Sequence, residues 1–123
     1  MPPSPKTILI IDDDSRNIFA LSAVLKSKGF TILSALSAQE GINLLQDHQG
    51  IKVVLMDIMM PDMDGYEAIA RIRAQEGTAR VPVIAVTAQA MVGDREKTLE
   101  AGANDYVSKP IDVDVLLKLL DKY

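Results

Sequence analysis

The sequence predicts an α/β domain in which a doubly wound parallel sheet is covered by helices on both faces. Three runs, at residues 8–11, 53–56 and 83–86, are continuously apolar and rich in β-branched residues, which is typical of central parallel strands. The segments between these runs carry apolar residues at helical spacing, as Ile18 and Leu21 do. Strand and helix therefore alternate along the chain, which is the pattern of an open parallel sheet.

Five strands are expected, each followed by a helix. In chain order the expected strands span residues 7–12, 31–36, 52–57, 82–87 and 105–108. The second strand has a more mixed composition and the fifth is short, which is typical of strands at the edges of a sheet. The other three have the apolar character of strands covered on both faces, so we expect them in its centre.

Five helices are expected between and after these strands. In chain order they span residues 15–28, 38–49, 65–76, 91–101 and 112–121. Two of the starts are marked by capping pairs, which are Ser37 with Glu40 and Asp64 with Glu67. Each of the first four helices is followed by a glycine, a residue that is favoured where the backbone turns left-handed after a helix. These glycines are Gly29, Gly50, Gly77 and Gly102.

Length and composition indicate one folded domain and exclude several classes of protein. The 123 residues suit a domain at 7–123 preceded by a short or disordered arm at 1–6. The net charge of −4 and the lack of a basic cluster argue against direct nucleic-acid binding. Without cysteine, disulfides and thiolate metal sites are excluded. We expect no membrane span and, because no signal peptide is recognisable, a cytoplasmic location.

Polar side chains follow four of the expected strands. These residues are Asp12, Asp13 and Asp14 after the first strand, Asp57 at the end of the third, Thr87 at the end of the fourth, and Lys109 and Pro110 after the fifth. Ligands bind outside the carboxyl ends of the strands in open parallel sheets, so these residues are expected to converge on one site. Carboxylates held so close together repel one another, and a hard divalent cation relieves that repulsion.

The residue types predict metal-assisted phosphoryl transfer to a carboxylate. We expect Mg²⁺, held by Asp12 and Asp13 together with water, and Asp57 as the nucleophile, because it is a lone acid at the end of an apolar strand. Thr87 and Lys109 suit the neutralisation of phosphoryl oxygens. Asp14 is expected to cap the following helix and not to bind metal.

Four segments carry a resemblance to a known family. They are ILIIDDD at 8–14, LMDIMMPDMDG at 55–65, VTAQA at 86–90 and AGANDYVSKP at 101–110. In order and spacing they resemble the receiver domain of two-component response regulators, and the resemblance covers essentially the whole chain. Segments 12–21, 94–97 and 111–115 are most similar to receivers attached to hybrid histidine kinases, although a free-standing regulator remains equally open.

The resemblance implies a fold and a role for each site residue. It implies a flavodoxin-like (βα)5 sheet with strand order 2-1-3-4-5. It implies that Asp57 is phosphorylated, with Mg²⁺, or alternatively Mn²⁺, bound by Asp13, by Asp12 largely through water, by Asp57 and by the backbone carbonyl of Met59. Thr87 and Lys109 would bind the phosphoryl group, and a cis peptide at Pro110 would aim Lys109. Tyr106 would be a switch residue.

The predicted function is a phosphoacceptor switch in a two-component or phosphorelay system. The phosphoryl donor would be a histidine kinase or a histidine phosphotransfer protein, and the surface formed by the fourth helix, fifth strand and fifth helix would be read by a downstream effector protein or domain. We expect a monomer, with dimerisation on phosphorylation left open. The chain would assist its own phosphorylation and dephosphorylation without being a separate turnover enzyme, unless it is a segment of a hybrid kinase.

Two other functions are alternatives that the sequence leaves open. The first is a Mg²⁺-dependent phosphohydrolase with an aspartyl phosphate intermediate, but such enzymes usually carry a second acid two residues after the nucleophile, where this chain has Met59. The second is a flavodoxin-like cofactor binder, but the turn after the first strand is acidic, which disfavours an anionic phosphate.

Overall fold

The elements of the structure follow the predicted alternation of strands and helices. The computed structural model describes residues 6–48, 50–58, 60–61, 63–87 and 94–123. In chain order the elements are β1 (Thr7–Ile11), α1 (Ser15–Ser27), β2 (Thr31–Ala35), α2 (Ala38–Asp47), β3 (Ile51–Asp57), α3 (Gly65–Ala74), β4 (Val83–Thr87), α4 (Asp94–Glu100), β5 (Asp105–Ser108) and α5 (Val113–Leu120). The expected arm at 1–6 lies outside the described residues except for Lys6.

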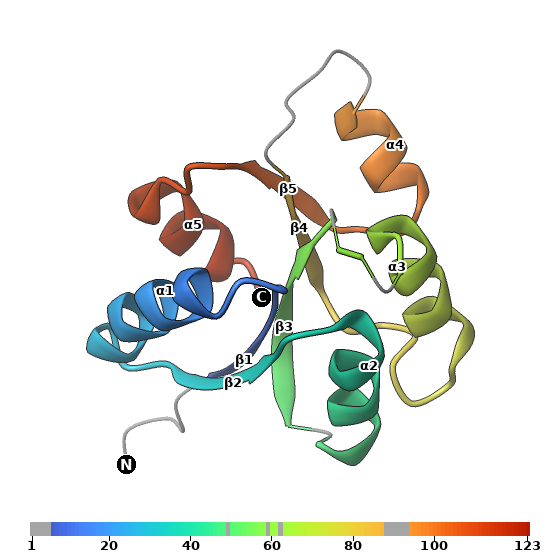
Figure 1. Cartoon of the computed structure of the whole chain (residues 1–123), viewed down its shortest axis with the longest axis horizontal. Coiled ribbons are helices and arrows are strands. Elements are labelled where there is room, and N and C mark those ends of the chain that lie inside the picture. Colours follow the sequence, from blue (N-terminus) through green and yellow to red (C-terminus); the bar gives the residue numbers. More distant parts are fainter. Residues whose placement is uncertain (1–5, 49, 59, 62, 88–93) are drawn as a thin grey trace.

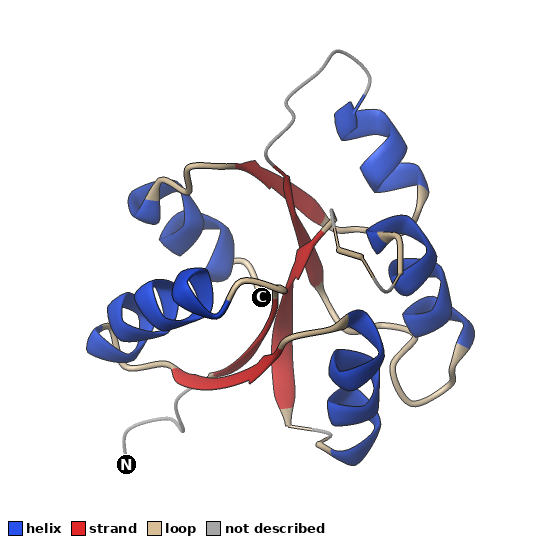
Figure 2. Cartoon of the chain, viewed as in Figure 1, coloured by secondary structure: helices blue, strands red, loops and turns tan. Residues whose placement is uncertain are grey.

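The strands form one parallel sheet with helices on both faces. The strand order is β2-β1-β3-β4-β5, so β2 and β5 form the edges as predicted. Helices α1 and α5 cover one face, and α2, α3 and α4 lie on the other (Figure 1). Figure 2 shows the same arrangement as a layer of strands between two layers of helices. The predicted fold class, a flavodoxin-like doubly wound (βα)5 sheet, is therefore confirmed.

The hydrophobic core is divided by the sheet into two halves. Leu9 and Met56 pack into the half that includes α2 and α3, whereas Ile10 and Leu55 pack into the half that includes α1 and α5. Successive residues of a strand point to opposite faces, so a strand buried on both faces needs apolar residues at every position. This explains the continuous apolar runs of the sequence.

Several elements are a few residues shorter than predicted, and local chemistry explains the difference. β4 begins at Val83 instead of 82, because Pro82 has no N–H to donate, although its carbonyl accepts from Val54 N at 2.9 Å. α3 ends at Ala74 instead of 76, because Gln75 is already extended. The expected start of the fourth helix, at 91, lies outside the described residues.

The two left-handed glycines mark helix ends, as predicted. Gly29 follows α1 with φ 95° and Gly102 follows α4 with φ 116°. The same expectation is wrong for Gly77, because α3 has ended before that residue is reached. Gly50 adjoins residue 49, which lies outside the described residues.

The surroundings of two helical glycines indicate that the fold tolerates alanine differently at the two positions. A Cβ at Gly65 would lie 2.6 Å from the backbone Cα of Ile58, whereas a Cβ at Gly41 would meet only side-chain atoms, Cγ1 and Cδ1 of the buried Ile11. Backbone cannot rotate away, so we expect Gly65→Ala to cost about 1–3 kcal/mol of unfolding free energy. Gly41→Ala should cost less, and chemical denaturation measures both. Equal losses would contradict this reading of the two contacts.

Two hydrogen bonds hold the carboxyl-terminal end of α5 and the residues after it, one to the residue before β1 and one to the first residue of β5. Lys6 Nζ donates to Leu120 O at 2.9 Å, and the Tyr123 hydroxyl donates to Asp105 Oδ2 at the start of β5. Burial, together with the hydrogen bond and the charge of Asp105, raises the pKa of Tyr123 to about 12. The neutral phenol is therefore the form that the folded state favours.

This contact predicts a loss of stability in alkali. The contribution of Tyr123 is fully present below its ordinary pKa of 10.0 and is lost as the pH rises through about 12. Tyr123→Phe should lower the unfolding free energy by about 1 kcal/mol below pH 10 and remove this part of the alkaline loss. Chemical denaturation at several pH values between 10.0 and about 12 measures the unfolding free energy, with Tyr66→Phe as the control. An unchanged alkaline loss in Tyr123→Phe would contradict the assignment.

Within the described part of the chain, the helices are all too short or too polar to cross a membrane.

Candidate phosphoacceptor site

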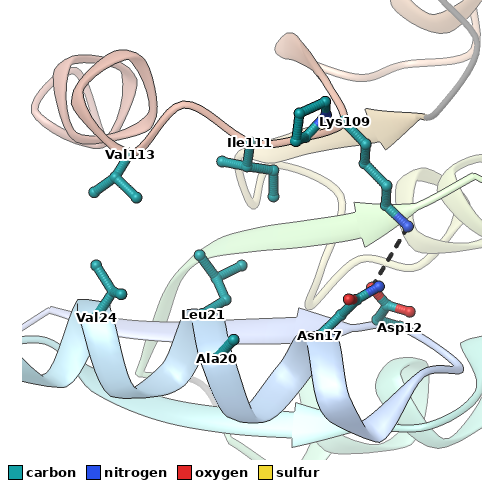
Figure 3. Close-up of a pocket in the computed structure, with 9 residues that line it drawn as sticks. Asp12, Asn17, Ala20, Leu21, Val24, Lys109, Ile111 and Val113 are labelled. Atoms are coloured by element: carbon teal, nitrogen blue, oxygen red, sulfur yellow. Dashed lines mark ion pairs between the residues drawn. The ribbon is translucent and has the colours of Figure 1, made fainter.

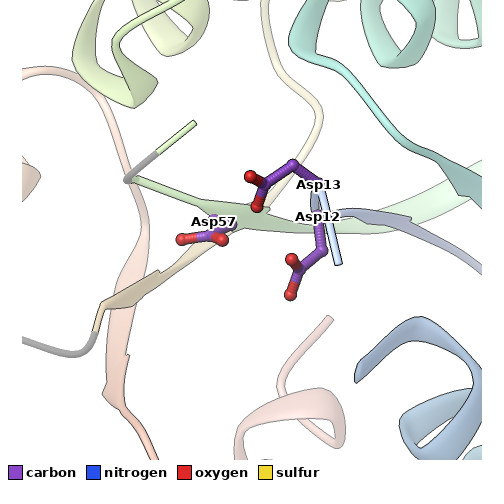
Figure 4. Close-up of side chains that lie close together, drawn as sticks. All are labelled: Asp12, Asp13 and Asp57. Atoms are coloured by element: carbon purple, nitrogen blue, oxygen red, sulfur yellow. The ribbon is translucent and has the colours of Figure 1, made fainter. Parts of the chain in front are cut away.

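Three carboxylates meet at the carboxyl edge of the sheet. β1 lies beside β3 with Ile11 opposite Met56, so the residues that follow these two, Asp12 and Asp57, are also neighbours. Asp13 is next in the chain, and one carboxylate oxygen of each of the three acids lies within 4.8 Å of the others. Figure 4 shows the three side chains gathered above the ends of the two strands. The predicted convergence of these acids is therefore observed.

An ammonium group faces the two buried acids. Asp12 is 7% exposed and Asp57 is 4% exposed, whereas Asp13 is exposed. Lys109 Nζ lies 3.3 Å from Asp57 Oδ2 and 3.7 Å from Asp12 Oδ2. The Lys109 backbone N–H donates to Thr87 O at 2.7 Å, which ties the residue after β5 to the end of β4. The peptide bond between Lys109 and Pro110 is cis, as the resemblance implies.

The surroundings of Asp12 disfavour the ionised form of its carboxylate. Burial, and then the charge of Asp57, raise the pKa of Asp12 above its ordinary value. The Asp14 backbone N–H, which donates to Asp12 Oδ1 at 2.9 Å, and the Lys109 ammonium act in the opposite direction. Burial and like-charge repulsion therefore outweigh the favourable contacts, so the site disfavours its own negative charge.

The donor set suits a hard divalent cation. Three carboxylates lie together, and among the described residues one ammonium, that of Lys109, lies within ion-pairing distance of two of them, so the site is negatively charged. Mg²⁺ prefers a few protein carboxylates and several waters, and the exposure of Asp13 leaves one side of the cluster open to water. Mn²⁺ has the same preference for oxygen. Met59, whose backbone carbonyl is the further expected ligand, lies outside the described residues.

Removal of the Asp12 charge should stabilise the metal-free chain. The pKa of Asp12 is raised in the folded state. The stability that this residue contributes is therefore fully present below pH 3.8 and is lost as the pH rises through the raised pKa. Asp12→Asn keeps an oxygen for the Asp14 N–H, so we expect a higher unfolding free energy at neutral pH in a chelator. Mg²⁺ should stabilise the wild type, by about 2.7 kcal/mol at a hundred times its Kd, and stabilise this variant much less.

Denaturation with chelator and with Mg²⁺ measures both effects. Asp13→Asn is the matched variant, because Asp13 is exposed: it should change metal-free stability little and still weaken the response to Mg²⁺. If Asp12→Asn were less stable than the wild type in chelator, the argument that this carboxylate is destabilised by its surroundings would be wrong.

The other predicted residues lie in β4, in β5 and in the turn that leads into α1. Thr87 is the last residue of β4 and is buried, next to β3, which ends at Asp57. Tyr106 is half-buried in β5, opposite Ala85. Asp14 caps α1, accepting from Arg16 N at 2.9 Å, as predicted.

A groove beside the site was not predicted. It encloses about 500 Å³ between α1 and the chain that leads from β5 into α5. Figure 3 shows Leu21 and Val24 of α1 facing Ile111 and Val113, with Asp12 and Lys109 at one end. Phe19, also on α1, is 76% exposed. Phe19 does not line the groove, and no local pattern of the sequence indicates the groove itself.

The fold and the site together define a class of protein, a parallel α/β domain with a buried carboxylate, acidic neighbours and a lysine at the carboxyl edge of its sheet. Comparison with known families identifies the family to which the chain belongs. The model of the response regulator receiver domain matches residues 8–121, so the chain belongs to that family. Receiver domains of this family are signalling switches and not turnover enzymes.

Similar proteins include receivers from bacteria and eukaryotes. The chain is 36% identical over 124 residues to hybrid signal transduction histidine kinase I of Dictyostelium discoideum, covering 95% of this chain and 7% of the kinase. The receiver domain of a Pseudomonas aeruginosa sensor histidine kinase, solved with magnesium in its active-site cleft, is 36% identical with a TM-score of 0.88, over 97% of each chain. The Saccharomyces cerevisiae Ssk1 receiver, solved with the histidine phosphotransfer protein Ypd1, is 26% identical with a TM-score of 0.87, over 100% of this chain and 91% of that one.

Proposed function

We propose that this receiver is phosphorylated on Asp57 by a phosphohistidine of a partner protein, in a reaction that requires Mg²⁺ or Mn²⁺. One observation carries the proposal: Asp57 is almost fully buried, yet its Oδ2 lies 3.3 Å from the Lys109 ammonium and within reach of two further acids. A structural salt bridge would not need those two acids, whereas a metal-assisted acceptor site would.

The chemistry is an in-line displacement at phosphorus. A carboxylate oxygen of Asp57 forms the new O–P bond, the P–N bond to the imidazole breaks, and its electron pair stays on the departing nitrogen. The Thr87 hydroxyl and the Lys109 ammonium hold the phosphoryl oxygens. Asp12, Asp13 and the Met59 carbonyl would bind the cation, which supplies charge neutralisation at those oxygens when bound.

The groove between α1 and α5 supports a protein as the phosphoryl donor. Its walls are apolar, and it ends at Asp12 and Lys109, so a partner seated there would bring its own side chains to the site. A histidine kinase or a histidine phosphotransfer protein, such as the Ypd1 found with the Ssk1 receiver, fits this description.

The output surface of the proposal is formed by α4, β5 and α5, with Tyr106 as the switch residue. α4 connects β4, which ends in Thr87, to β5, which precedes Lys109, so both phosphoryl-binding residues adjoin this surface. Leu99 on α4 and Val115 on α5 are exposed apolar residues that an effector would cover. New bonds from the phosphoryl group would supply the difference in free energy between the two states.

Incubation with a small phosphodonor tests the proposal. With Mg²⁺ the chain should gain one phosphoryl group, and this group should be labile to hydroxylamine, as an acyl phosphate is; with chelator it should gain none. Equal labelling in chelator, or a label stable to hydroxylamine, would exclude the mechanism. Rapid release of phosphate over many turnovers of a small substrate would instead favour the phosphohydrolase.

A further inference from the structure

The groove between α1 and the segment that leads into α5 has two apolar walls that are partly exposed to solvent. Leu21 and Val24 of α1 and Ile111 and Val113 of the opposite wall are half-buried and face one another across the groove (Figure 3). Leu21 and Ile111 also pack against the core of the domain, which holds the two walls in place. A ligand with an apolar body would remove this surface from water, and such burial stabilises a complex.

The size and lining of the groove suit a small molecule. The groove encloses about 500 Å³. Small-molecule sites in proteins have volumes of roughly 300–1,000 Å³ and combine apolar walls with a few polar groups that orient the ligand. Here the polar lining residues Asp12, Asn17 and Lys109 lie at one end of the groove (Figure 3). A matching ligand therefore has an apolar body and one polar head.

The charges at this end of the groove determine the sign of the head. Lys109 Nζ lies 3.7 Å from Asp12 Oδ2 and 3.3 Å from Asp57 Oδ2, so these two carboxylates share one ammonium. Asp13 adds a third carboxylate, whose oxygen lies within 4.8 Å of an oxygen of each of the other two. A cationic head would offset this excess of negative charge, whereas an anionic head would add to it. The Asn17 side chain offers an amide oxygen as a hydrogen-bond acceptor for the same head.

We propose that the groove binds a small amphipathic cation, with its apolar body between α1 and the segment before α5 and its ammonium or amidinium head at Asp12. Because Asp12 is also an expected ligand of Mg²⁺, the small molecule and Mg²⁺ compete for this carboxylate. A bound ligand therefore lowers the rate of Mg²⁺-dependent phosphorylation and excludes a partner protein from the groove, and these two consequences rest on the proposed function. Binding itself rests on the groove and its charges.

The probe for this site is 4-phenylbutylamine, which joins a phenyl ring and a four-carbon stem to one ammonium. Two matched compounds separate the contributions: 4-phenylbutanoate keeps the body and reverses the charge, and butylamine keeps the head without the ring. Titration of the full chain in chelator, followed by NMR, measures the affinities and shows which residues respond. We expect 4-phenylbutylamine to bind at least about tenfold more tightly than either matched compound, and Mg²⁺ to weaken its binding.

Two alanine positions of α1 test where the probe binds. Ala20 is exposed and lines the groove, so Ala20→Leu fills part of it from the surface of the helix. Ala23 is an exposed alanine of the same helix that does not line the groove, so Ala23→Leu is the matched control. We expect Ala20→Leu to weaken the binding of 4-phenylbutylamine by about tenfold and Ala23→Leu to leave it unchanged, with both variants unfolding at the denaturant concentration of the wild type. Asp12→Asn should also weaken the binding, because it removes a charge that faces the head.

Four outcomes would overturn the inference. The first is the absence of saturable binding of 4-phenylbutylamine up to about 10 mM. The second is equal affinity for this amine and for 4-phenylbutanoate, because the charges of the groove would then not select the ligand. The third is unchanged binding in Ala20→Leu, which would place the probe elsewhere, and the fourth is binding that Mg²⁺ does not affect, which would place the head away from Asp12. The proposed function would fail on a different result, the absence of phosphorylation by a small phosphodonor with Mg²⁺ when no amine is present.

Discussion

Replacement of Asp57 by asparagine is expected to reduce phosphorylation by a small phosphodonor to less than about 1% of wild type, because a carboxamide is not a nucleophile toward phosphorus. Neither neighbouring acid can take over. Asp12 is held by the Asp14 N–H and disfavours its own charge, and Asp13 is exposed at the outer side of the cluster, away from the Lys109 ammonium that faces the other two acids. Incorporation of phosphoryl group with Mg²⁺, followed by mass spectrometry, measures the loss.

The matched control for this substitution is Asp14→Asn. Asp14 lies two residues from Asp12 and caps α1 by accepting from Arg16 N, a role that asparagine fills equally well. Asp14→Asn should therefore be phosphorylated like the wild type and unfold at the same denaturant concentration. Comparable labelling of the Asp57→Asn chain would remove Asp57 as the acceptor, whatever the control showed.

The ends of the strands can be predicted from the sequence, which explains why the close approach of the three carboxylates was expected. A strand buried on both faces must be apolar at every position, so the first polar residue after it marks the edge of the sheet, as Asp12 and Asp57 do. The order of the strands was not contained in such local patterns. It followed from the resemblance, and the pairing of β1 with β3 confirms it.

Features that depend on packing between distant segments could not be predicted. The contacts of Arg73 with Gly102 and Asn104 span about thirty positions of the chain, and no local pattern indicates them. The raised pKa of Asp12 likewise depends on how deeply the folded chain buries it. The hydroxyl of the buried Thr98, which has no hydrogen-bond partner among the described residues, is the same kind of feature, since threonine on a helix is ordinary until its surroundings are known.

Substitution of Lys109 by methionine should separate metal binding from phosphoryl transfer. Methionine keeps much of the apolar stem and removes the ammonium that lies 3.3 Å from Asp57 Oδ2. Loss of a charge that stabilises the transferring group costs roughly 100-fold or more in rate, so we expect phosphorylation with Mg²⁺ to slow by about that factor. Mg²⁺ affinity should rise, because the cation no longer competes with an ammonium for the same carboxylates.

The rise in Mg²⁺ affinity is the decisive half of this prediction, because a variant that is merely misfolded would lose both activities. Lys118→Met is the control, since Lys118 is an exposed lysine of α5 and should affect neither. Titration with Mg²⁺ and the rate of labelling are measured on the same samples. If Lys109→Met bound Mg²⁺ more weakly, Lys109 would be organising the carboxylates for the metal; if it labelled at the wild-type rate, the ammonium would have no part in the transfer. Only opposite changes in the two quantities agree with an ammonium that balances the acids before phosphorylation and binds the phosphoryl group after it.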